Sequence, residues 1–332
     1  MTNIYTTSSI GAFQARAKLY DLRVNKGYEA IDRPSYLVLG TLFHKAKEAW
    51  IESGFQLHKA KQVIKEANLK NEDIRCKAYA MIAAYTRVHK YEKETTKYHA
   101  IEHEFICNAG NNRKFAGICD AIVYRDSNWW ILETKTAATV DESYFNRMKR
   151  QRQALMYVYA LKYLSGDVTI TGDVKYKHIA GVLYDFIQKP SLRRRKATPP
   201  EKRRYTKDGE LYKGQREVDE SDVDYINRMH DWYVENEKEV ITRMEVVFTD
   251  NQIYKFAFDI NTAVGVMEFC EGEGIWPPSY AACHSHNSPC EFVDYCWSAD
   301  SPMVLDSFYR KREKRFAEFE NDIGAIQIQA KK

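Results

Sequence analysis

Residues 114–135 read KFAGICDAIVYRDSNWWILETK, and this stretch predicts two antiparallel strands joined by a tight turn. Apolar, β-branched and aromatic residues fill both halves, while the polar RDSN sequence separates them. If residues 126–127 form a two-residue turn, counting back equally along both strands places Asp120 opposite Glu133. The hairpin therefore predicts two carboxylates on one face of a sheet.

The same face carries Lys135, because side chains two residues apart on a strand point the same way. Two carboxylates whose Cβ atoms lie ~5 Å apart repel each other unless a cation lies between them. Mg²⁺ or Mn²⁺ accepts such carboxylates and keeps coordination sites for phosphate oxygens. We therefore predict metal-dependent phosphodiester cleavage, in which Asp120 and Glu133 bind the metal and Lys135 either orients the attacking water or neutralises charge on the phosphate.

An alternative is that Glu133 and Lys135 form an ordinary surface charge pair and that Asp120 is an acid near a turn. The sequence ICDAIV weighs against it, because Asp120 interrupts an apolar strand, where burying an unpartnered acid is costly.

The rest of the chain alternates between helical and strand periodicity. Helices are predicted first, then three strands, a long helix, another strand and further helices, which indicates a mixed α/β core with helical additions. The predicted helices lie at residues 33–50, 57–69, 73–92 and 141–164, and the strands outside the hairpin at 99–107 and 177–188.

Composition sets limits on the class of protein. The 332 residues are 44% hydrophobic and 13% aromatic, enough for a large core, and the net charge of +4 is too small to establish a polyanionic partner. No apolar run approaches the ~20 residues of a membrane span and no leader peptide is visible, so we expect a cytoplasmic protein without a membrane partner. The seven cysteines favour free thiols or metal ligands over disulfides.

Two basic segments are candidate DNA contacts. Gln153 and Tyr157 lie one helical turn apart, and Lys149 is expected to extend the same stripe by another turn. Amide and aromatic groups beside cations suit sequence-tolerant binding of single strands, although a solvated basic helix face is the alternative. Residues 189–216 form a basic loop or lid. Its candidate contacts are Arg193, Arg194 and Arg195, with Tyr205 and Tyr212 as stacking residues.

These residues resemble the PD-(D/E)XK nuclease superfamily, in which an Asp on one strand precedes a (D/E)-x-K on the next. Asp120, Glu133 and Lys135 match that catalytic set. The resemblance extends to the RecB-like branch. Its further matches are GTLFH, implying His44 as a metal ligand; AIEHEF, implying Glu102 as an acidic counterpart; GICD, with Gly117 three residues before the Asp; and QALMY, implying Gln153 and Tyr157. It also implies the Thr134 backbone carbonyl as a ligand.

The resemblance implies a restriction-endonuclease-like core, a mixed central sheet flanked by helices, in one nuclease domain spanning residues 1–332. Its expected parts are a helical part at 1–97, the catalytic core at 98–188, the basic insertion at 189–216, and a helical, cysteine-containing part at 217–332.

The expected activity is a Mg²⁺- or Mn²⁺-dependent deoxyribonuclease, and most simply an exonuclease on single strands or DNA ends, since no helix-turn-helix or finger module is visible to read bases. Recombination, repair or phage DNA metabolism is the expected setting, with recombination or helicase proteins as partners and the host cytoplasm as location if phage-encoded. Two other functions stay open: a catalytically degenerate module that binds single strands, and a metal-stabilised structural protein.

The segment CHSHNSPCEFVDYC resembles the C-terminal cysteine trio of iron–sulfur members of the branch, with Cys283, Cys290 and Cys296 as ligands. There a fourth cysteine comes from the N-terminal helix, but here Arg16 stands at about that position. Three options follow. Cys270 could complete a [4Fe-4S] site, His284 or His286 could complete a Zn²⁺ site, or the segment binds no metal.

Overall fold

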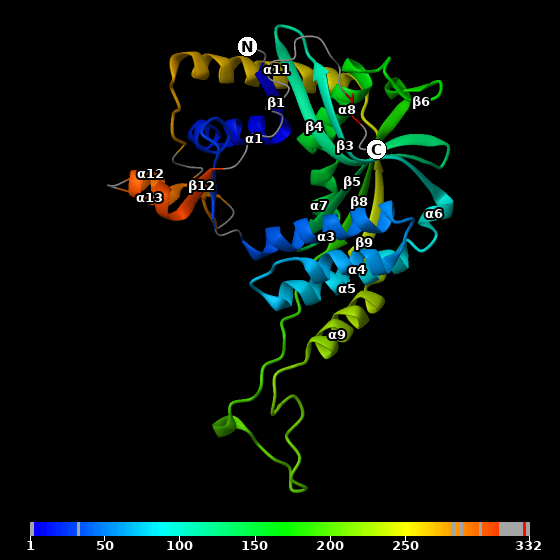
Figure 1. Ribbon diagram of the computed structural model, residues 1–332, viewed down its shortest axis with the longest axis vertical. Helices are drawn as coiled ribbons and strands as arrows, with labels where there is room; N and C mark the ends of the chain where they lie inside the picture. The colour runs from blue at the N-terminus through cyan, green and yellow to red at the C-terminus, as the bar shows by residue number, and fades with distance from the viewer. Residues whose placement is uncertain are drawn as a thin grey trace.

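A mixed sheet forms the centre of the computed structural model, which describes residues 3–31, 34–279, 283–285, 288–298, 301–311 and 328–329 (Figure 1). The strand order is β13-β3-β4-β5-β8-β9, and β1 pairs with β4. The strands are β1 Asn3–Thr6, β3 Thr96–Asn108, β4 Arg113–Arg125, β5 Asn128–Ala137, β8 Ile179–Gln188, β9 Ile241–Val246 and β13 Ile328–Gln329. The expected mixed α/β core with a central sheet is confirmed.

The hairpin between β4 and β5 has the expected tip. Arg125 lies opposite Asn128, and the two turn residues Asp126 and Ser127 have φ values of 47° and 63°. Two successive positive φ angles are typical of a type I′ turn, whose twist matches that of the flanking strands. The tip therefore fixes the register of the hairpin as the sequence indicates.

One edge of β4 is shared by two different strands. The strand β3 follows one edge over most of its length, so β1 and β5 both lie along the other. Residues 113–116 pair with β1 and residues 121–125 pair with β5. Between these ladders, residues 117–120 have no strand partner on that edge among the described strands, and Asp120 is the last residue of this gap.

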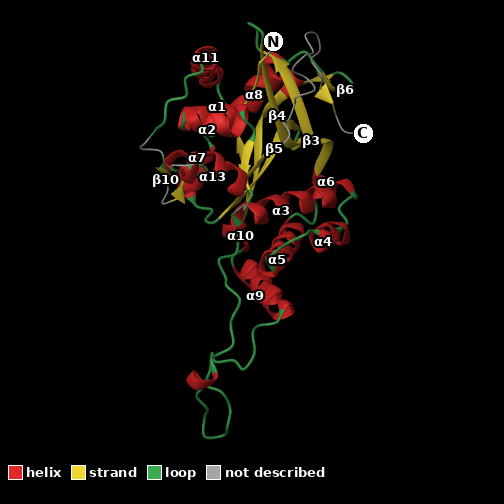
Figure 2. Ribbon diagram, turned by 60° about the vertical axis from the view of Figure 1, so that its left-hand side comes forward, coloured by secondary structure: helices red, strands yellow, loops and turns green. Residues whose placement is uncertain are grey.

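Helices cover the sheet on both faces (Figures 1 and 2). One hydrophobic cluster joins α3 (Ser35–Glu52), α4 (Leu57–Glu66), α5 (Glu72–Val88) and α9 (Asp222–Glu235) to the sheet at Ile187 and Ile241. A second joins α7 (Glu142–Met148) and α8 (Arg152–Val158) to Tyr184 and Phe186. Because neighbouring residues on a strand point to opposite faces, Phe186 and Ile187 serve different helical layers.

A third cluster joins the N-terminal helices to the long helix α11 (Asp250–Glu273). The remaining α-helices are α1 Thr7–Ala15, α2 Ala17–Tyr20, α6 Glu92–Thr95, α10 Glu237–Val240, α12 Val293–Trp297 and α13 Ser301–Phe308. The π- and 3₁₀-helices are η1 Asp21–Asn25, η2 Tyr159–Leu164, η3 Tyr176–His178 and η4 Pro200–Lys202. The small strands are β2 Tyr28–Ala30, β6 Thr169–Thr171, β7 Val174–Lys175, β10 His284–Ser285, β11 Ser288–Pro289 and β12 Tyr309–Lys311.

The expected helix at 141–164 is interrupted. Lys149 is the C-cap of α7, and Gln151, with an extended backbone, is the N-cap of α8. The two helices pack on different parts of the sheet, since Tyr144 and Phe145 contact Phe186 while Tyr157 contacts Phe105 on β3. Strand β9 was not expected either. Within the described part of the chain, no helix combines the length and apolar character that crossing a membrane would need.

Gly117 lies at the start of the gap in β4 and is expected to tolerate no side chain. A Cβ there would lie 2.6 Å from Cζ of Phe105 and 2.8 Å from Cε1 of Tyr157. We predict that Gly117→Ala lowers the free energy of unfolding by about 1–3 kcal/mol, because both packed rings must move. Urea unfolding followed by circular dichroism measures this.

The matched control is Gly272→Ala, in α11, where a Cβ meets no atom within 4 Å. This variant should be as stable as the wild type or slightly more stable, because Ala favours a helix over Gly. Equal effects of the two substitutions would contradict the packing argument.

Candidate active site

Asp120 lies where β4 and β5 part. The ladder of the hairpin ends at the pair Ala121 and Leu132, one position before Asp120 and Glu133. Beyond that pair, the side chain of Asp120 forms the next contact between the two strands. Its Oδ2 accepts a hydrogen bond of 2.7 Å from the backbone N–H of Thr134. The structure thus brings Asp120 next to the E-x-K segment, although the two carboxylates are not paired across a continued ladder.

Glu133 and Lys135 form a direct ion pair. Nζ of Lys135 lies 2.6 Å from Oε1 of Glu133, whose side chain is 6% exposed. The other oxygen, Oε2, is buried and has no hydrogen-bond partner among the residues that the structure describes. Burial and the neighbouring Asp120 raise the pKa of Glu133, while Lys135 opposes them. One oxygen of Glu133 is therefore buried beside a second acid and has no partner in the described part of the chain.

His44 faces the other oxygen of Asp120. Its Nδ1 lies 3.5 Å from Oδ1 of Asp120. Gly40, one turn earlier, allows α3 to lie close to β5, because a Cβ at that position would lie 3.0 Å from Oγ1 of Thr136 on β5. Burial alone would raise the pKa of Asp120, but His44 and the nearby Lys47 outweigh it, so this pKa is lowered. Burial would lower the pKa of His44, yet Asp120 leaves it raised.

Gln153 and Tyr157 continue the chain of contacts. Oε1 of Gln153 accepts a hydrogen bond of 2.6 Å from Lys135, and its Nε2 donates to the hydroxyl of Tyr157. That hydroxyl donates to the carbonyl of Ile118 inside the gap of β4. Tyr157 is only 3% exposed. The ring of Tyr157 therefore lies in the interior and not on the surface, where a contact with DNA was expected.

Lys149 and Arg194 do not lie where the sequence suggested. Lys149 follows the end of α7, is exposed, and does not extend the stripe of Gln153 and Tyr157, because the helix is broken at that point. Arg194 binds Asp73 at 2.7 Å and Asp222 at 2.6 Å, with its side chain 12% exposed. Its guanidinium therefore anchors the loop to α5 and α9. The side chains of Arg193 and Arg195 are exposed.

Glu102 occupies an unusual backbone conformation. It lies between Ile101, paired with Ala121, and His103, paired with Cys119, and so falls opposite Asp120. Its φ is 46°, in the left-handed region that non-glycine residues seldom adopt. Such strain, of ~1–3 kcal/mol, is found mostly at functional sites. The register thus places Glu102 beside Asp120, and its role as an acidic counterpart stays a prediction.

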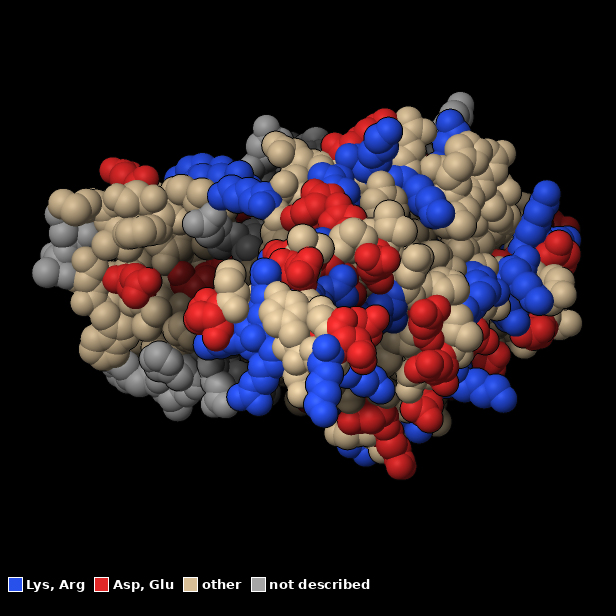
Figure 3. Space-filling view, turned by 90° about the horizontal axis from the view of Figure 1, so that it is seen from below, with Lys and Arg blue, Asp and Glu red and all other residues tan. Residues whose placement is uncertain are grey.

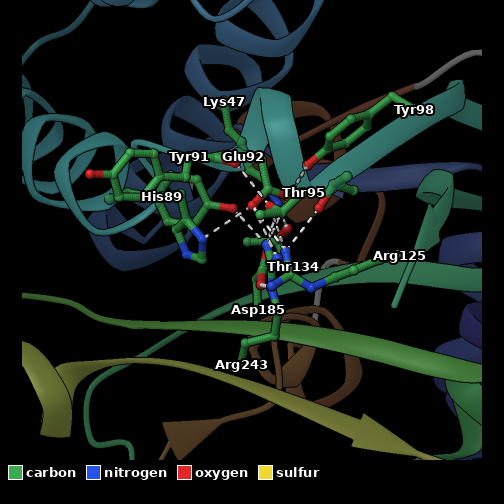
Figure 4. A network of polar contacts seen from close by, with 12 residues as sticks. Lys47, His89, Tyr91, Glu92, Thr95, Tyr98, Arg125, Thr134, Asp185 and Arg243 are labelled. Carbon is green, nitrogen blue, oxygen red and sulfur yellow. Dashed lines mark hydrogen bonds and ion pairs between the residues drawn. The ribbon is translucent and has the colours of Figure 1, made fainter. Parts of the chain in front are cut away.

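A buried polar network behind the site was missed by sequence reasoning (Figure 4). Asp185, on β8, is 0% exposed. It accepts hydrogen bonds from Arg243 at 2.5 and 3.0 Å, from Tyr85 at 2.6 Å and from Lys47 at 3.1 Å. Burial alone would raise the pKa of Asp185, but Arg243 and Lys47 hold it well below its usual value. Two signals were available: Asp185 interrupts an apolar strand as Asp120 does, and Lys47 lies one turn after His44.

The network extends from Asp185 to a second buried acid, Glu92. Arg243 binds both carboxylates, reaching Glu92 with two contacts of 3.1 Å. Tyr98 donates to the same acid at 2.9 Å, and His89 lies 3.5 Å away. Burial would raise the pKa of Glu92, yet His89 and Arg243 lower it to about 2. The buried charges of this cluster are thus paired and hydrogen-bonded, as burial of charge requires.

The C-terminal cysteines do not assemble a metal site in the described part of the chain. Cys283, Cys290 and Cys296 line one cavity of about 200 Å³ together with Arg16, whereas Cys270 is buried in α11 and does not line it. The side chain of His284 and all of His286 lie outside the described residues. Among the residues described, no three His, Cys, Asp or Glu side chains gather closely enough to hold an ion as they stand. Iron–sulfur or zinc binding therefore has no support here.

Comparisons with known proteins address the family. The family model described as the PD-(D/E)XK nuclease superfamily matches residues 8–296. Among curated proteins, no sequence matches the chain.

The His44–Asp120 pair is expected to make stability depend on pH. A raised pKa of His44 adds stability that is complete below its unfolded pKa of about 6.5 and is lost as pH rises through the folded value. A lowered pKa of Asp120 adds stability above about pH 3.9, lost as pH falls. The pair therefore stabilises most between about pH 4 and 6.5.

Accordingly, His44→Gln should destabilise the metal-free protein more at pH 5.5 than at pH 9, by a small amount, because His44 is 31% exposed. Chemical unfolding in EDTA at both pH values measures the difference. His58→Gln, on the exposed surface of α4, is the control and should have the same effect at both. A His44→Gln effect independent of pH would contradict the ion pair.

Proposed function

The chain belongs to the PD-(D/E)XK nuclease superfamily, and on that premise we propose that it is a metal-dependent deoxyribonuclease whose site consists of Asp120, Glu133 and Lys135. The observation that carries the proposal is the state of Glu133. One of its oxygens is held by Lys135 at 2.6 Å, while the other is buried without a hydrogen-bond partner among the described residues. A buried acceptor left in this way is costly unless a cation or water binds it.

The donor types at this place suit a hard divalent cation, although the side chains of His44, Asp120 and Glu133 as they stand do not gather closely enough to hold one. Mg²⁺ and Mn²⁺ prefer carboxylate and carbonyl oxygens, and Mn²⁺ also accepts imidazole. We assign Asp120, Glu133 and the Thr134 carbonyl as ligands, with His44 as an additional ligand beside Asp120. When bound, such a cation polarises a phosphoryl oxygen and lowers the pKa of a bound water.

The protein's own residues then have separate roles in hydrolysis, in which a water oxygen bonds to phosphorus and one ester oxygen departs. The ammonium group of Lys135 lies beside the acids and is the group that neutralises negative charge on the phosphate. Gln153 fixes that ammonium group, since it accepts a hydrogen bond from Lys135 and is itself tied to Tyr157.

We further propose that the chain is of the RecB-like type and forms a single nuclease domain. The support is that His44 on α3 faces Asp120 and Gln153 on α8 binds Lys135, with Gly40 one turn before His44 and Tyr157 one turn after Gln153, and that the family match spans residues 8–296. Exonuclease action on single strands or ends, in recombination, repair or phage DNA metabolism, is the finer proposal.

A projecting loop is the second element of the proposal. Residues 189–221, which we call the arm, leave the body between β8 and α9 and extend away from it (Figures 1 and 2). Arg194 anchors its base. Farther out, the backbone N–H of Thr198 donates to the carbonyl of Arg216 at 2.8 Å, and Tyr205 bridges to Leu211. The arm is thus held by hydrogen bonds without a core of its own.

The arm offers cations and aromatic rings to a nucleic acid. Seen from below, the side of the molecule that carries the arm mixes basic with acidic side chains (Figure 3). The cations that can bind a nucleic acid are therefore those without an ion-pair partner. Tyr205 is 49% and Tyr212 is 53% exposed. We propose that Arg193, Arg195 and the cations at the tip of the arm, residues 202–213, bind the phosphate backbone of a nucleic-acid strand while these rings stack on bases. Four exposed tip cations form no ion pair with a described residue: Lys202, Arg204, Lys207 and Lys213.

Removing either acid should strongly reduce cleavage. We expect Asp120→Asn and Glu133→Gln each to reduce Mg²⁺-dependent cleavage on the order of 100-fold or more, because the cation loses a ligand. Labelled linear and covalently closed circular DNA, single- and double-stranded, are the substrates, and a folded state is checked by circular dichroism. Degradation of linear DNA alone would support the exonuclease assignment.

The control for this experiment is Asp126→Asn, at the exposed tip of the same hairpin, which should cleave like the wild type. If a folded Asp120→Asn or Glu133→Gln protein keeps near-normal activity, the proposed ligand set is wrong.

Loss of the four tip cations should weaken binding of single-stranded DNA. In the combined variant in which Lys202, Arg204, Lys207 and Lys213 become Gln, we expect the slope of log K against log salt to flatten. The expected change is ~0.7 for each phosphate that the variant no longer neutralises. Fluorescence anisotropy in EDTA measures binding without cleavage.

A variant with the same loss of charge elsewhere is the control. It replaces four exposed lysines of α4 and α6 by Gln: Lys59, Lys61, Lys65 and Lys93. An equal change of slope in both variants would show that overall charge, and not the arm, governs binding.

A further inference from the structure

Lys47 connects the buried network to the proposed active site. It lies on α3 three residues after His44 and is 3% exposed. Its Nζ donates to Oδ2 of Asp185 at 3.1 Å and to the hydroxyl oxygen of Thr134 at 2.5 Å. Thr134 stands between Glu133 and Lys135 on β5. Lys47 therefore reaches the central residue of the E-x-K segment from behind (Figure 4).

Thr134 links Lys47 to Asp120 through two hydrogen bonds. Its side chain accepts the hydrogen bond from Lys47, while its backbone N–H donates to Oδ2 of Asp120 at 2.7 Å. This hydrogen bond joins Asp120 to β5 at a point where the hairpin ladder has already ended. The position of the Asp120 carboxylate therefore depends on where Thr134 is held.

A purely structural role does not by itself account for Lys47. Asp185 already accepts three hydrogen bonds, two from Arg243 and one from Tyr85. An isolated buried charge pair is seldom more stabilising than apolar packing. What Lys47 adds beyond these partners is its contact with Thr134, and its neighbour on α3 is His44, which faces Asp120.

We propose that Lys47 is a positioning residue that places Asp120 for metal binding through the hydroxyl of Thr134. The inference rests on the proposed function, because it assumes that Asp120 is a metal ligand. Removing an outer partner of a ligand typically costs 10- to 100-fold in metal affinity. Lys47 then acts on affinity without touching the cation.

The test is Mn²⁺ binding, measured by isothermal titration calorimetry without nucleic acid. Lys47→Met and Thr134→Val should each weaken Mn²⁺ binding by about 10-fold. Because both remove the same hydrogen bond, the double variant should bind no more weakly than either single variant. Additive losses would overturn the inference, since Lys47 would then act otherwise than through the Thr134 hydroxyl.

Tyr85→Phe is the matched control. Tyr85 is fully buried and donates to the same oxygen of Asp185 as Lys47 does, at 2.6 Å, but its hydroxyl is bonded to Asp185 and not to Thr134. It should lower the melting temperature and leave Mn²⁺ affinity unchanged. Loss of Mn²⁺ affinity in Tyr85→Phe equal to that in Lys47→Met would overturn the inference, because general loosening of the network would explain both.

If Lys47→Met does not fold, a comparison of Thr134→Ser with Thr134→Val still tests the role of the hydroxyl. Ser retains the hydroxyl, so this variant should bind Mn²⁺ like the wild type while Thr134→Val binds it weakly; equal affinities of the two overturn the inference. Absence of Mn²⁺ binding by the wild type would instead contradict the ligand set of the proposed function. The two failures are therefore distinguishable.

Discussion

The gap between two ladders on one edge of β4 is the constraint on which the site depends. Backbone groups in a buried strand must find hydrogen-bond partners, and β1 and β5 provide them only on either side of residues 117–120. Inside the gap, Tyr157 binds the carbonyl of Ile118, and the side chain of Asp120 binds the N–H of Thr134. Side chains thus replace the missing ladder, and an acid is held at an opening in the sheet.

The same helix turn supplies charge to two acids at different depths. Asp120 and Asp185 each interrupt an apolar strand, and α3 presents His44 to the first and Lys47 to the second. Asp185, the more deeply buried of the two, is bonded by Arg243, Lys47 and Tyr85, and these contacts favour a rigid support for the site. Glu133, by contrast, keeps one buried oxygen without a described partner. The difference separates a supporting cluster from a site that can accept a ligand.

Much of the site could be predicted from local sequence because strand registers propagate from a turn. The hairpin tip at Asp126 and Ser127 sets the pairing, and so the proximity of Asp120 to the E-x-K segment followed by counting. The failures arose where packing decided. Lys149 does not share a helix face with Gln153, because the helix is interrupted where its two parts pack on different parts of the sheet. Tyr157 is buried because Gly117 leaves room for its ring.

By itself the sequence determined the mixed α/β class, the hairpin and the residue types near its open end, since these follow from periodicity, turn chemistry and alternation over short distances. The family match agrees with that core. Only the tertiary structure decided that Lys47, Asp185 and Arg243, which lie far apart in the chain, form one buried cluster behind Thr134. It also decided that Arg194 anchors the arm. The physical reason is that a buried charge takes its partners from whichever elements pack around it, and no local pattern records which elements those are.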